Sequence, residues 1–399
     1  MKGRKRHDFV YRLGWTLVHR PMAKMFKFEY DAIDVCHSPY IVISNHLTNY
    51  DPILIGLSFR KPMYYVASDH VLRSGLKGKL LNFLMAPIVR AKTIQETQTV
   101  ISIFRRLKEN CNICIFAEGS TSFDGETGEV QRSIGKLVKR AGAALVTYRF
   151  TGSYFTFPRW ARFIHKGKMQ GRLVQIYSPE KIASMTEDEI YDALMKDIYV
   201  NAYAEQEKAP VEYIGEKPAE YLETTLYCCP KCRQFSTLKS RDDTLFCECG
   251  FQAHYNKFGY FETPGKKEPP PFATILDWAK WQREEIKSLA EKMEGLDIST
   301  PVFTDEDQLL FQITRASHNT LIAEGKLALF KDRLSVIEKS GRIIEFPLDN
   351  IADIGIITMM TIIFSTNENK VYEIHSKRPR SALKYMEIYR ARKKSRSKL

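Results

Sequence analysis

Hydrophobic and polar positions alternate along the first half of the chain in a way that predicts a layered α/β domain. Short runs rich in β-branched and aromatic residues are typical of buried strands, and they lie at 40–44, 63–67, 87–90, 112–117, 144–150 and 172–177. Segments with helical spacing separate or follow them, at 76–85, 93–110, 132–142 and 186–207. This alternation favours a largely parallel sheet with helices on its faces. Ligands of such sheets bind outside the carboxyl ends of the strands.

The pattern changes in the second half of the chain. The segment 263–271, TPGKKEPPP, has the composition of a linker and precedes a helix expected near 272–293. From Leu321 onward, short strands are separated by turn signals and end in a helix at about 379–392. This arrangement favours a small β-barrel of the pleckstrin-homology (PH) type.

The N-terminal segment from Phe9 to Phe28 has helical spacing that places Arg12, Thr16 and His19 on one narrow stripe. Apolar residues cover most of the rest, so this helix could lie in a bilayer interface or pack on the domain. Pro21 is expected to kink or end it. No run of about 18 uncharged apolar residues occurs, and the basic start lacks the apolar part of a signal peptide. We expect a cytoplasmic protein that is peripheral on the cytoplasmic face of the membrane.

Charge is concentrated at the two ends of the chain. Of the formal net charge of +13, residues 2–27 carry +7 and residues 376–399 carry +9, so the chain between them is slightly acidic. Two basic ends suggest an anionic surface as partner, either a membrane or nucleic acid, or else two solvated tails. The ends lack interleaved aromatic residues on a platform, which makes nucleic acid the less favoured partner.

The stretch ISNHLTNYDP, residues 43–52, places His46 in a predicted strand-to-helix loop. Asp51 followed by Pro52 predicts a helix N-cap. The loop can also fold Asp51 back onto one imidazole nitrogen and leave the other free, which is the arrangement of a general base. The alternative is that Asp51 only caps the helix and His46 only fills a turn.

A second polar stretch, AEGSTSFDG, follows the predicted strand at 112–116. It puts Glu118 at the same sheet edge as His46, and Gly119 allows a turn or a close approach of substrate.

Together, NHLTNYD (45–51) and FAEGSTS (116–122) resemble the glycerolipid acyltransferase family, the 1-acylglycerol-3-phosphate acyltransferases, over roughly residues 25–200. The resemblance implies that His46 is the catalytic base and Asp51 orients it. It also implies that Glu118 and Gly119 bind the acceptor. Arg90, in APIVRAKT, matches a phosphate-contacting arginine.

One departure from the family pattern concerns the acceptor phosphate. The family motif usually continues with an arginine where this chain has Thr121, and a hydroxyl does not replace a bidentate guanidinium. Another cation could substitute, or the acceptor could be a different lipid. The candidates are Arg132, Lys136, Arg149, Arg159 and Arg162, with Arg149 preferred because it ends a strand.

The resemblance implies direct acyl transfer from acyl-CoA or acyl-carrier protein to the hydroxyl of a lysophospholipid. The most direct acceptor is 1-acyl-sn-glycerol-3-phosphate, which would give phosphatidic acid. The alternative class is a membrane- or nucleic-acid-binding zinc-ribbon protein that carries a vestigial acyltransferase fold.

The eight cysteines do not form a disulfide pattern and instead favour a reducing compartment. Cys111 and Cys114 lie on a predicted strand and are expected in the core. Two close pairs, in CCPKC and CECG, predict a structural zinc ribbon. Its expected ligands are Cys229, Cys232, Cys247 and Cys249, with Cys228 as a competing ligand.

The sequence thus predicts an α/β acyltransferase domain with a mostly parallel sheet, a small zinc ribbon and a C-terminal β-rich, PH-like domain. The expected boundaries are an amphipathic helix at 1–28, the acyltransferase domain at 29–210, the zinc ribbon at 222–262, a linker and helix at 263–300, and the PH-like domain with its basic tail at 301–399.

Overall fold

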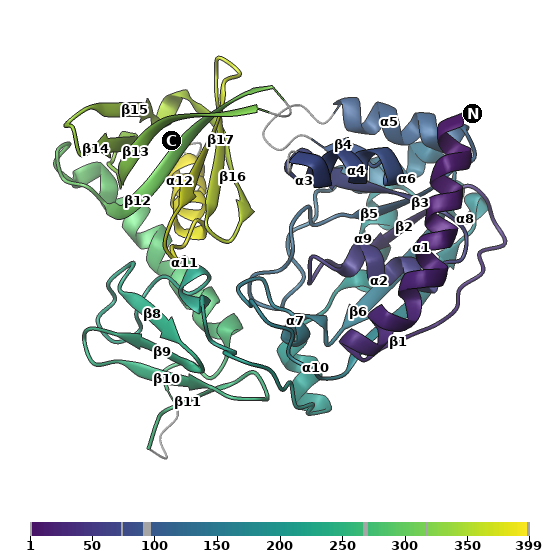
Figure 1. Cartoon of the computed structure of the whole chain (residues 1–399), viewed down its shortest axis with the longest axis horizontal. Coiled ribbons are helices and arrows are strands. Elements are labelled where there is room, and N and C mark those ends of the chain that lie inside the picture. Colours follow the sequence, from purple (N-terminus) through teal and green to yellow (C-terminus); the bar gives the residue numbers. More distant parts are fainter. Residues whose placement is uncertain (1, 73–74, 91–96, 266–269, 316–317, 397–399) are drawn as a thin grey trace. The chain divides into compact units, whose positions relative to one another are not determined.

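The computed structural model describes residues 2–72, 75–90, 97–265, 270–315 and 318–396. They form two units, which Figure 1 shows along the chain. The first unit comprises the described residues up to 216 together with 257–259. The second comprises residues 217–256 and the described residues from 260 onward.

The first unit is built on one sheet whose strands are the apolar runs of the sequence. The strands are β1 (Phe28–Tyr30), β2 (Tyr40–Ser44), β3 (Met63–Ser68), β4 (Ile88–Arg90), β5 (Asn112–Phe116), β6 (Ala144–Thr151) and β7 (Met169–Tyr177). Their order is β1-β7-β6-β2-β5-β3-β4. Only β6 and β7 pair antiparallel among these described neighbours. The mostly parallel sheet predicted from the alternating pattern is confirmed.

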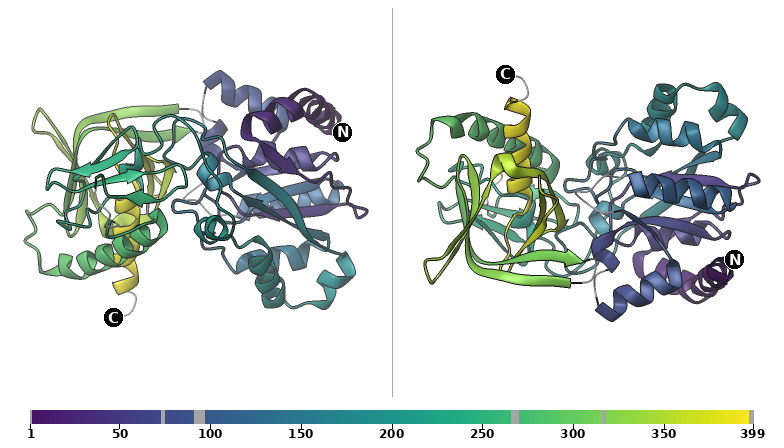
Figure 2. Two further views of the ribbon diagram at one scale, coloured as in Figure 1. Left: turned by 90° about the horizontal axis from the view of Figure 1, so that it is seen from below. Right: turned by 90° about the horizontal axis from the view of Figure 1, so that it is seen from above.

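Helices cover both faces of this sheet (Figure 2). They are α1 (Lys2–Phe26), α2 (Asp51–Ser58), α3 (Asp69–Leu72), α4 (Gly75–Met85), α5 (Thr97–Lys108), α6 (Ser133–Ala141), α7 (Ser153–Thr156), α8 (Pro179–Ser184), α9 (Glu187–Ile198) and α10 (Ala202–Lys208). On one face, Ile43 and Leu145 share a buried core with side chains of α5, α6 and α9. On the other face, the Tyr148 hydroxyl lies 2.6 Å from the Ser58 hydroxyl of α2.

Helix α1 contacts α2 and the residue that follows it through two aromatic side chains. The Tyr11 hydroxyl donates to the backbone oxygen of Phe59 at 3.1 Å, and the Trp15 indole donates to that of Leu57 at 3.0 Å. Pro21 was expected to kink or end the helix, and it does not end it, because the helix continues to Phe26. None of the described helices is long and apolar enough to cross a bilayer.

Two other helix predictions changed in detail. The segment expected as one helix at 186–207 is two helices, because the Asn201 side chain accepts the backbone N–H groups of Tyr203 and Ala204 and starts α10 anew. The first four residues of the helix expected at 93–110 lie outside the described residues.

The second unit contains two antiparallel sheets. The smaller one has the order β11-β10-β9-β8 and consists of β8 (Leu238–Arg241), β9 (Thr244–Cys247), β10 (Gln252–Tyr255) and β11 (Phe261–Glu262). The larger one has the order β15-β14-β13-β12-β18-β17-β16 and consists of β12 (Phe303–Arg315), β13 (His318–Leu329), β14 (Arg333–Glu338), β15 (Ile343–Pro347), β16 (Ile351–Thr358), β17 (Thr361–Thr366) and β18 (Val371–Ser376). Helix α12 (Leu383–Arg396) follows it. The β-rich C-terminal region is therefore confirmed, and its PH-like character stays a prediction.

Helix α11 (Ile275–Lys292) supplies the core of the smaller sheet. Trp278 is fully buried, and its ring lies 5.5 Å from that of Phe251 and 5.4 Å from that of Phe261 between ring centres. Its indole N–H donates to the backbone oxygen of Cys228 at 2.9 Å. The helix expected as part of a linker segment is packed on the cysteine-rich module.

Candidate functional site

His46 and Asp51 form a hydrogen-bonded pair at the carboxyl end of β2. The Nδ1 atom of His46 lies 2.9 Å from Oδ2 of Asp51. The Asp51 side chain is fully buried, whereas that of His46 is 16% exposed. No hydrogen bond involves Nε2 of His46 among the described residues. One face of the imidazole lies against the Phe116 ring, 4.4 Å away between ring centres. One ring nitrogen is thus fixed by a carboxylate, and the other is open.

Asp51 holds the loop rather than capping the helix. Its Oδ2 accepts the backbone N–H groups of Leu47 and Thr48 at 2.7 and 2.9 Å, and its Oδ1 accepts the Thr48 hydroxyl at 2.8 Å. The N-cap residue of α2 is Tyr50, which makes no capping hydrogen bond with its side chain. The predicted N-cap role of Asp51 is therefore wrong. The carboxylate instead fixes the backbone that follows the imidazole it orients.

Glu118 connects the base to a second loop. One carboxylate oxygen accepts the backbone N–H of His46 at 2.7 Å, and the other accepts that of Gly128 at 2.6 Å. Burial raises the pKa of Glu118 to about 8, although both of these N–H groups lower it. Because both oxygens are engaged by backbone donors, the geometry suits Glu118 to positioning His46. Its predicted role in binding the acceptor stays a prediction.

Gly119 and Arg90 meet beside Glu118. Gly119 has a φ of +68°, which favours glycine. A Cβ atom at this position would lie 2.4 Å from a guanidinium nitrogen of Arg90, so a larger residue would displace that cation. Arg90, at the end of β4, is therefore brought to the loop that carries the second motif. Its predicted contact with the acceptor phosphate stays a prediction.

Arg149 is not brought to this loop. Its Nε donates to the backbone oxygen of Asp197 at 2.6 Å and its Nη2 to that of Lys196 at 3.1 Å, at the C-terminal end of α9. These carbonyls lack helical partners and attract a cation. Arg149, the preferred phosphate-binding candidate, thus contacts the C-terminal end of a helix instead.

Arg159, a less favoured candidate, does reach the second motif. Its Nη1 donates to the hydroxyls of Ser120 and Thr121, each at 2.8 Å. Its guanidinium lies 4.3 Å above the centre of the Phe123 ring, and burial lowers the pKa of Arg159 to about 10. Its Nε is buried without a hydrogen-bond partner, and among the described residues it has no ion pair with a carboxylate. The guanidinium of Arg159 therefore lies beside Thr121, although position 121 itself is not an arginine.

The second motif and the base are in direct backbone contact. The N–H of Ser122 donates to the backbone oxygen of His46 at 2.9 Å. The loop at 118–122 therefore brings Glu118, Arg90 and Arg159 to the neighbourhood of the His46–Asp51 pair. The position of this loop after a strand could be predicted from the sequence. The approach of Arg159 could not, because residues 157–168 show no periodic pattern.

Residues 27–151 match the family model described as Acyltransferase. This segment is an acyltransferase-family domain. The match runs from β1 to β6 and contains His46, Asp51, Arg90 and Glu118. None of the curated proteins matches the chain.

Several solved structures resemble parts of the chain. The 1-acyl-sn-glycerophosphate (LPA) acyltransferase PlsC from Thermotoga maritima has 18% identity and a TM-score of 0.39, over 49% of this chain and 82% of that one. The C-terminal domain of an unknown protein from Leishmania infantum has 13% identity and a TM-score of 0.16, over 24% of this chain and 84% of that one. The linker-DH/PH domains of p115-RhoGEF have 12% identity and a TM-score of 0.18, over 30% of this chain and 44% of that one.

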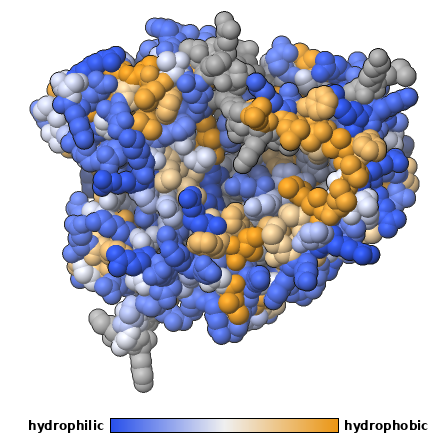
Figure 3. All heavy atoms as spheres, viewed as in Figure 1, coloured by the Kyte–Doolittle hydropathy of each residue, from blue (hydrophilic) through white to orange (hydrophobic). Residues whose placement is uncertain are grey.

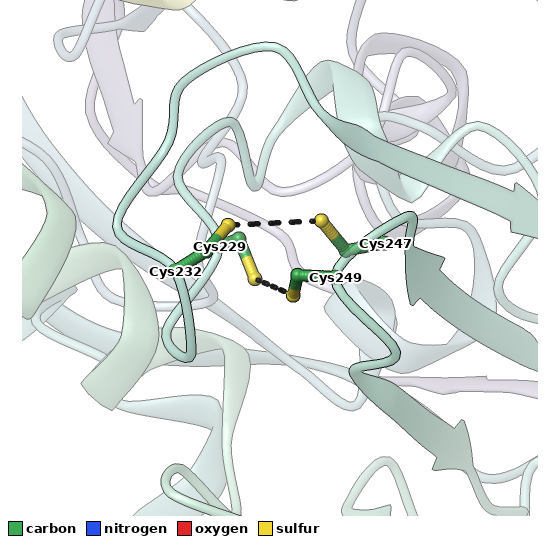
Figure 4. Close-up of side chains that lie close together, drawn as sticks. All are labelled: Cys229, Cys232, Cys247 and Cys249. Atoms are coloured by element: carbon green, nitrogen blue, oxygen red, sulfur yellow. Dashed lines mark hydrogen bonds between the residues drawn. The ribbon is translucent and has the colours of Figure 1, made fainter.

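Outside the acyltransferase domain, four cysteines form a cluster in the second unit (Figure 4). The sulfur atoms of Cys229, Cys232, Cys247 and Cys249 all lie within 4.8 Å of one another. The Cys229–Cys249 and Cys232–Cys247 sulfur separations are 3.6 and 3.8 Å. A tetrahedral zinc ion with thiolate bonds of about 2.3 Å holds its sulfurs about 3.8 Å apart, so the donor set fits zinc.

Local turns position these thiols. The first two cysteines lie in a turn in which the Arg233 N–H donates to the Cys229 oxygen at 2.9 Å. Gly250, with a φ of +81°, closes a second turn through its N–H to the Cys247 oxygen at 3.0 Å. Cys228 is buried outside the cluster, with its sulfur 3.6 Å from the Arg233 oxygen. The predicted set of four is brought together without the competing cysteine.

Proposed function

We propose that this protein is a glycerolipid acyltransferase that moves a fatty acyl group from acyl-CoA or acyl-carrier protein to the hydroxyl of a lysophospholipid. The most direct acceptor is 1-acyl-sn-glycerol-3-phosphate, and the product is then phosphatidic acid. The observation that carries the proposal is the His46–Asp51 pair, with Nδ1 held at 2.9 Å by a buried carboxylate and Nε2 open.

The chemistry needs one base and no covalent intermediate on the enzyme. Nε2 of His46 removes the proton from the acceptor hydroxyl as the oxygen attacks the thioester carbonyl. The new C–O bond forms, the C–S bond breaks, and the imidazolium returns its proton to the leaving thiolate. Asp51 stabilises the positive charge on the ring while it lasts. A positioned base of this kind is typically worth about 10²- to 10⁴-fold in rate.

The acceptor phosphate is recognised by the cations around the second motif. The Arg90 guanidinium lies against Gly119, and that of Arg159 lies against Ser120 and Thr121. A buried guanidinium without a carboxylate is stabilised by an anionic ligand, because charge-assisted hydrogen bonds then offset the cost of its burial. This supports a phosphorylated acceptor over an uncharged monoacylglycerol.

The zinc-ribbon part of the chain has a structural role in this proposal. Four thiolates leave no open coordination position, so a zinc ion held there stabilises the module and takes no part in acyl transfer. The alternative of a vestigial acyltransferase fold is not favoured, because the base, its carboxylate and the loop contacts of Glu118 are all formed.

The decisive experiment is an acyl-transfer assay on the purified protein. Thiol release from acyl-CoA is followed with lysophosphatidic acid or with monoacylglycerol as acceptor, for the wild type and for His46→Ala. We expect release that depends on lysophosphatidic acid in the wild type and is lost in the variant. The absence of acceptor-dependent release with either acyl-CoA or acyl-carrier protein as donor would reject the proposal.

A further inference from the structure

We propose that the second unit binds a phosphoryl group in a small cavity between the cysteine-rich module, β12 and the start of α12. The cavity measures about 30 Å³ and is partly open to solvent. Its polar lining residues are Glu223, Ser236, Asp305, Arg380, Ser381 and Lys384. All of them belong to the second unit, whereas the residues of the proposed acyl transfer belong to the first.

Arg380 is a buried cation whose hydrogen bonds are incomplete. The residue is only 4% exposed. Its Nη2 donates to the side-chain oxygen of Gln308 at 2.8 Å and to the backbone oxygens of Met360 and Ile374 at 3.0 and 3.4 Å. Its Nε and Nη1 are buried and have no hydrogen-bond partner in the described part of the chain. Unpaired donors on a buried charge are costly, so this guanidinium is suited to an anionic ligand.

The carboxylate of Asp305, which shares the cavity with Arg380, is already engaged by other groups. Its Oδ2 lies 2.7 Å from the Lys384 ammonium and accepts the Tyr385 hydroxyl at 2.5 Å. Asp305 attracts Arg380 without a hydrogen bond between them. Among the described residues, Arg380 therefore has no carboxylate as a direct partner.

Glu223 is the second carboxyl group at the cavity. Burial raises the pKa of Glu223, and its Oε2 accepts the Ser240 hydroxyl. A raised pKa favours the neutral carboxyl, which does not repel an anion and can donate a hydrogen bond to it. With Glu223 neutral, the charges of Arg380, Lys384 and Asp305 leave the cavity net positive.

The start of α12 adds a second source of positive potential. Ser381 lies two residues before this helix, and its hydroxyl accepts the backbone N–H of Lys384 at 3.4 Å. The first N–H groups of a helix lack helical partners and carry partial positive charge, which favours an anion beside them. A buried guanidinium and a helix N-terminus thus adjoin the same cavity.

The size of the cavity selects a compact ligand. A volume of about 30 Å³ gives room for about two waters, a space suited to one tetrahedral oxyanion. Because the cavity is partly open, the rest of a phosphate ester can stay outside it. Hydrophilic residues predominate on the face of the second unit that Figure 3 shows, which favours inorganic phosphate over a lipid headgroup as the source of the phosphoryl group.

The test is equilibrium dialysis of the full-length protein with radiolabelled inorganic phosphate at constant ionic strength. We expect saturable binding that weakens by about tenfold or more in Arg380→Met, because the variant loses charge-assisted hydrogen bonds. The matched control is Arg378→Met, which removes an exposed guanidinium whose Nε lies 2.6 Å from Asp307. Its phosphate affinity should equal that of the wild type. The absence of saturable binding, or equal affinity in the wild type and Arg380→Met, would overturn the inference.

Arg159→Ala separates this site from the proposed acceptor site. Phosphate binding that is lost in Arg159→Ala and kept in Arg380→Met would place the ion in the first unit and overturn the inference. Dialysis needs no acyl transfer, so an inactive protein that binds phosphate through Arg380 would reject the enzyme and keep this site.

A second measurement uses only the wild type, because Arg380→Met removes a buried side chain and its folding must be checked by circular dichroism. Wild-type crystals soaked in selenate should show an anomalous peak within hydrogen-bond distance of Arg380. Peaks found only elsewhere would overturn the inference.

Competition with glycerol 3-phosphate distinguishes the two sources of the phosphoryl group. Equal or weaker binding than that of inorganic phosphate would support the free ion as the ligand. Binding through Arg380 that is tenfold or more stronger would support the phosphoryl site and assign it to a lipid headgroup.

Discussion

The carboxylate of Glu118 accepts the backbone N–H of His46 at 2.7 Å, and through its other oxygen it accepts that of Gly128. The two motifs of the acyltransferase domain, about 70 residues apart in sequence, are therefore joined by a hydrogen bond between a side chain and the backbone of the base. A group that could be assigned to substrate binding also sets the position of the imidazole.

Replacing His46 by alanine should abolish acyl transfer without unfolding the protein. The variant loses the base held by Asp51, while the loop remains held by the contacts of Asp51 with Leu47 and Thr48. Acyl transfer would be measured with lysophosphatidic acid, and folding by circular dichroism and thermal unfolding. Retention of more than a small fraction of wild-type activity in a folded variant would remove His46 from the mechanism.

Asp51→Asn should lower kcat by about 10²- to 10⁴-fold, because an amide does not stabilise the imidazolium that forms during transfer. The amide oxygen can still accept the N–H groups of Leu47 and Thr48, so the variant should fold. Thr48→Val is the matched control, since it removes the hydroxyl bonded to Oδ1 of Asp51 and keeps the charge. The control should cost about 1 kcal/mol of stability and retain most of the activity. Similar activity in both variants would mean that the Asp51 charge is not needed.

The pKa of Glu118 predicts a pH dependence of stability. Its value of about 8 in the folded protein exceeds the ordinary 4.5, so the folded state binds more protons than the unfolded state between these two values. Stability should therefore fall as pH rises through this window, by at most about 1.4 kcal/mol per pH unit. Glu118→Gln removes the titration, so its unfolding free energy in urea should decline less steeply with pH. The exposed Glu207→Gln, which makes the same chemical change on the surface, should keep the wild-type slope. An unchanged slope in Glu118→Gln would contradict the prediction.

Arg159→Ala should reduce kcat/KM for lysophosphatidic acid by about 10- to 100-fold, the range expected for a lost charge-assisted hydrogen bond. Activity with monoacylglycerol, which has no phosphate, should change much less. The exposed Arg132→Ala is the control for a lost positive charge, since its guanidinium pairs with Asp188 on α9. Equal losses with both acceptors would assign Arg159 to holding the loop at Ser120 and Thr121 rather than to the phosphate.

The sequence predicted the His46–Asp51 pair because both residues follow a clearly apolar strand at a sheet edge. The sequence could not show whether Asp51 caps the helix, because several N–H groups near it can donate to its carboxylate. Only the folded loop shows that those of Leu47 and Thr48 do so. The choice between Arg149 and Arg159 was likewise beyond the sequence. Strand periodicity places residue 149 on one face of β6 but does not say that α9 covers that face.

The cysteine-rich module could also be predicted only in part from the sequence. Spacing identified the four thiols, since close pairs of cysteines are constrained locally by their turns. It did not identify the partner helix, because Phe251 and Phe261, which pack on Trp278, are separated from it in sequence by the predicted linker. The small sheet therefore has more of a core than its own strands suggested.

Zinc content provides the last prediction. Protein purified without chelator should contain about one zinc ion per chain, because the four sulfur atoms lie at separations suited to tetrahedral thiolate coordination. Cys229→Ser should lose the metal, whereas Cys228→Ser should keep it, since the Cys228 sulfur lies outside the cluster. Trp278 reports on the module, because its indole N–H bonds to the Cys228 oxygen and its ring packs on Phe251. A strong zinc chelator should therefore change tryptophan fluorescence in the wild type and in Cys228→Ser, and metal loss from Cys228→Ser but not from Cys229→Ser would reassign the ligands.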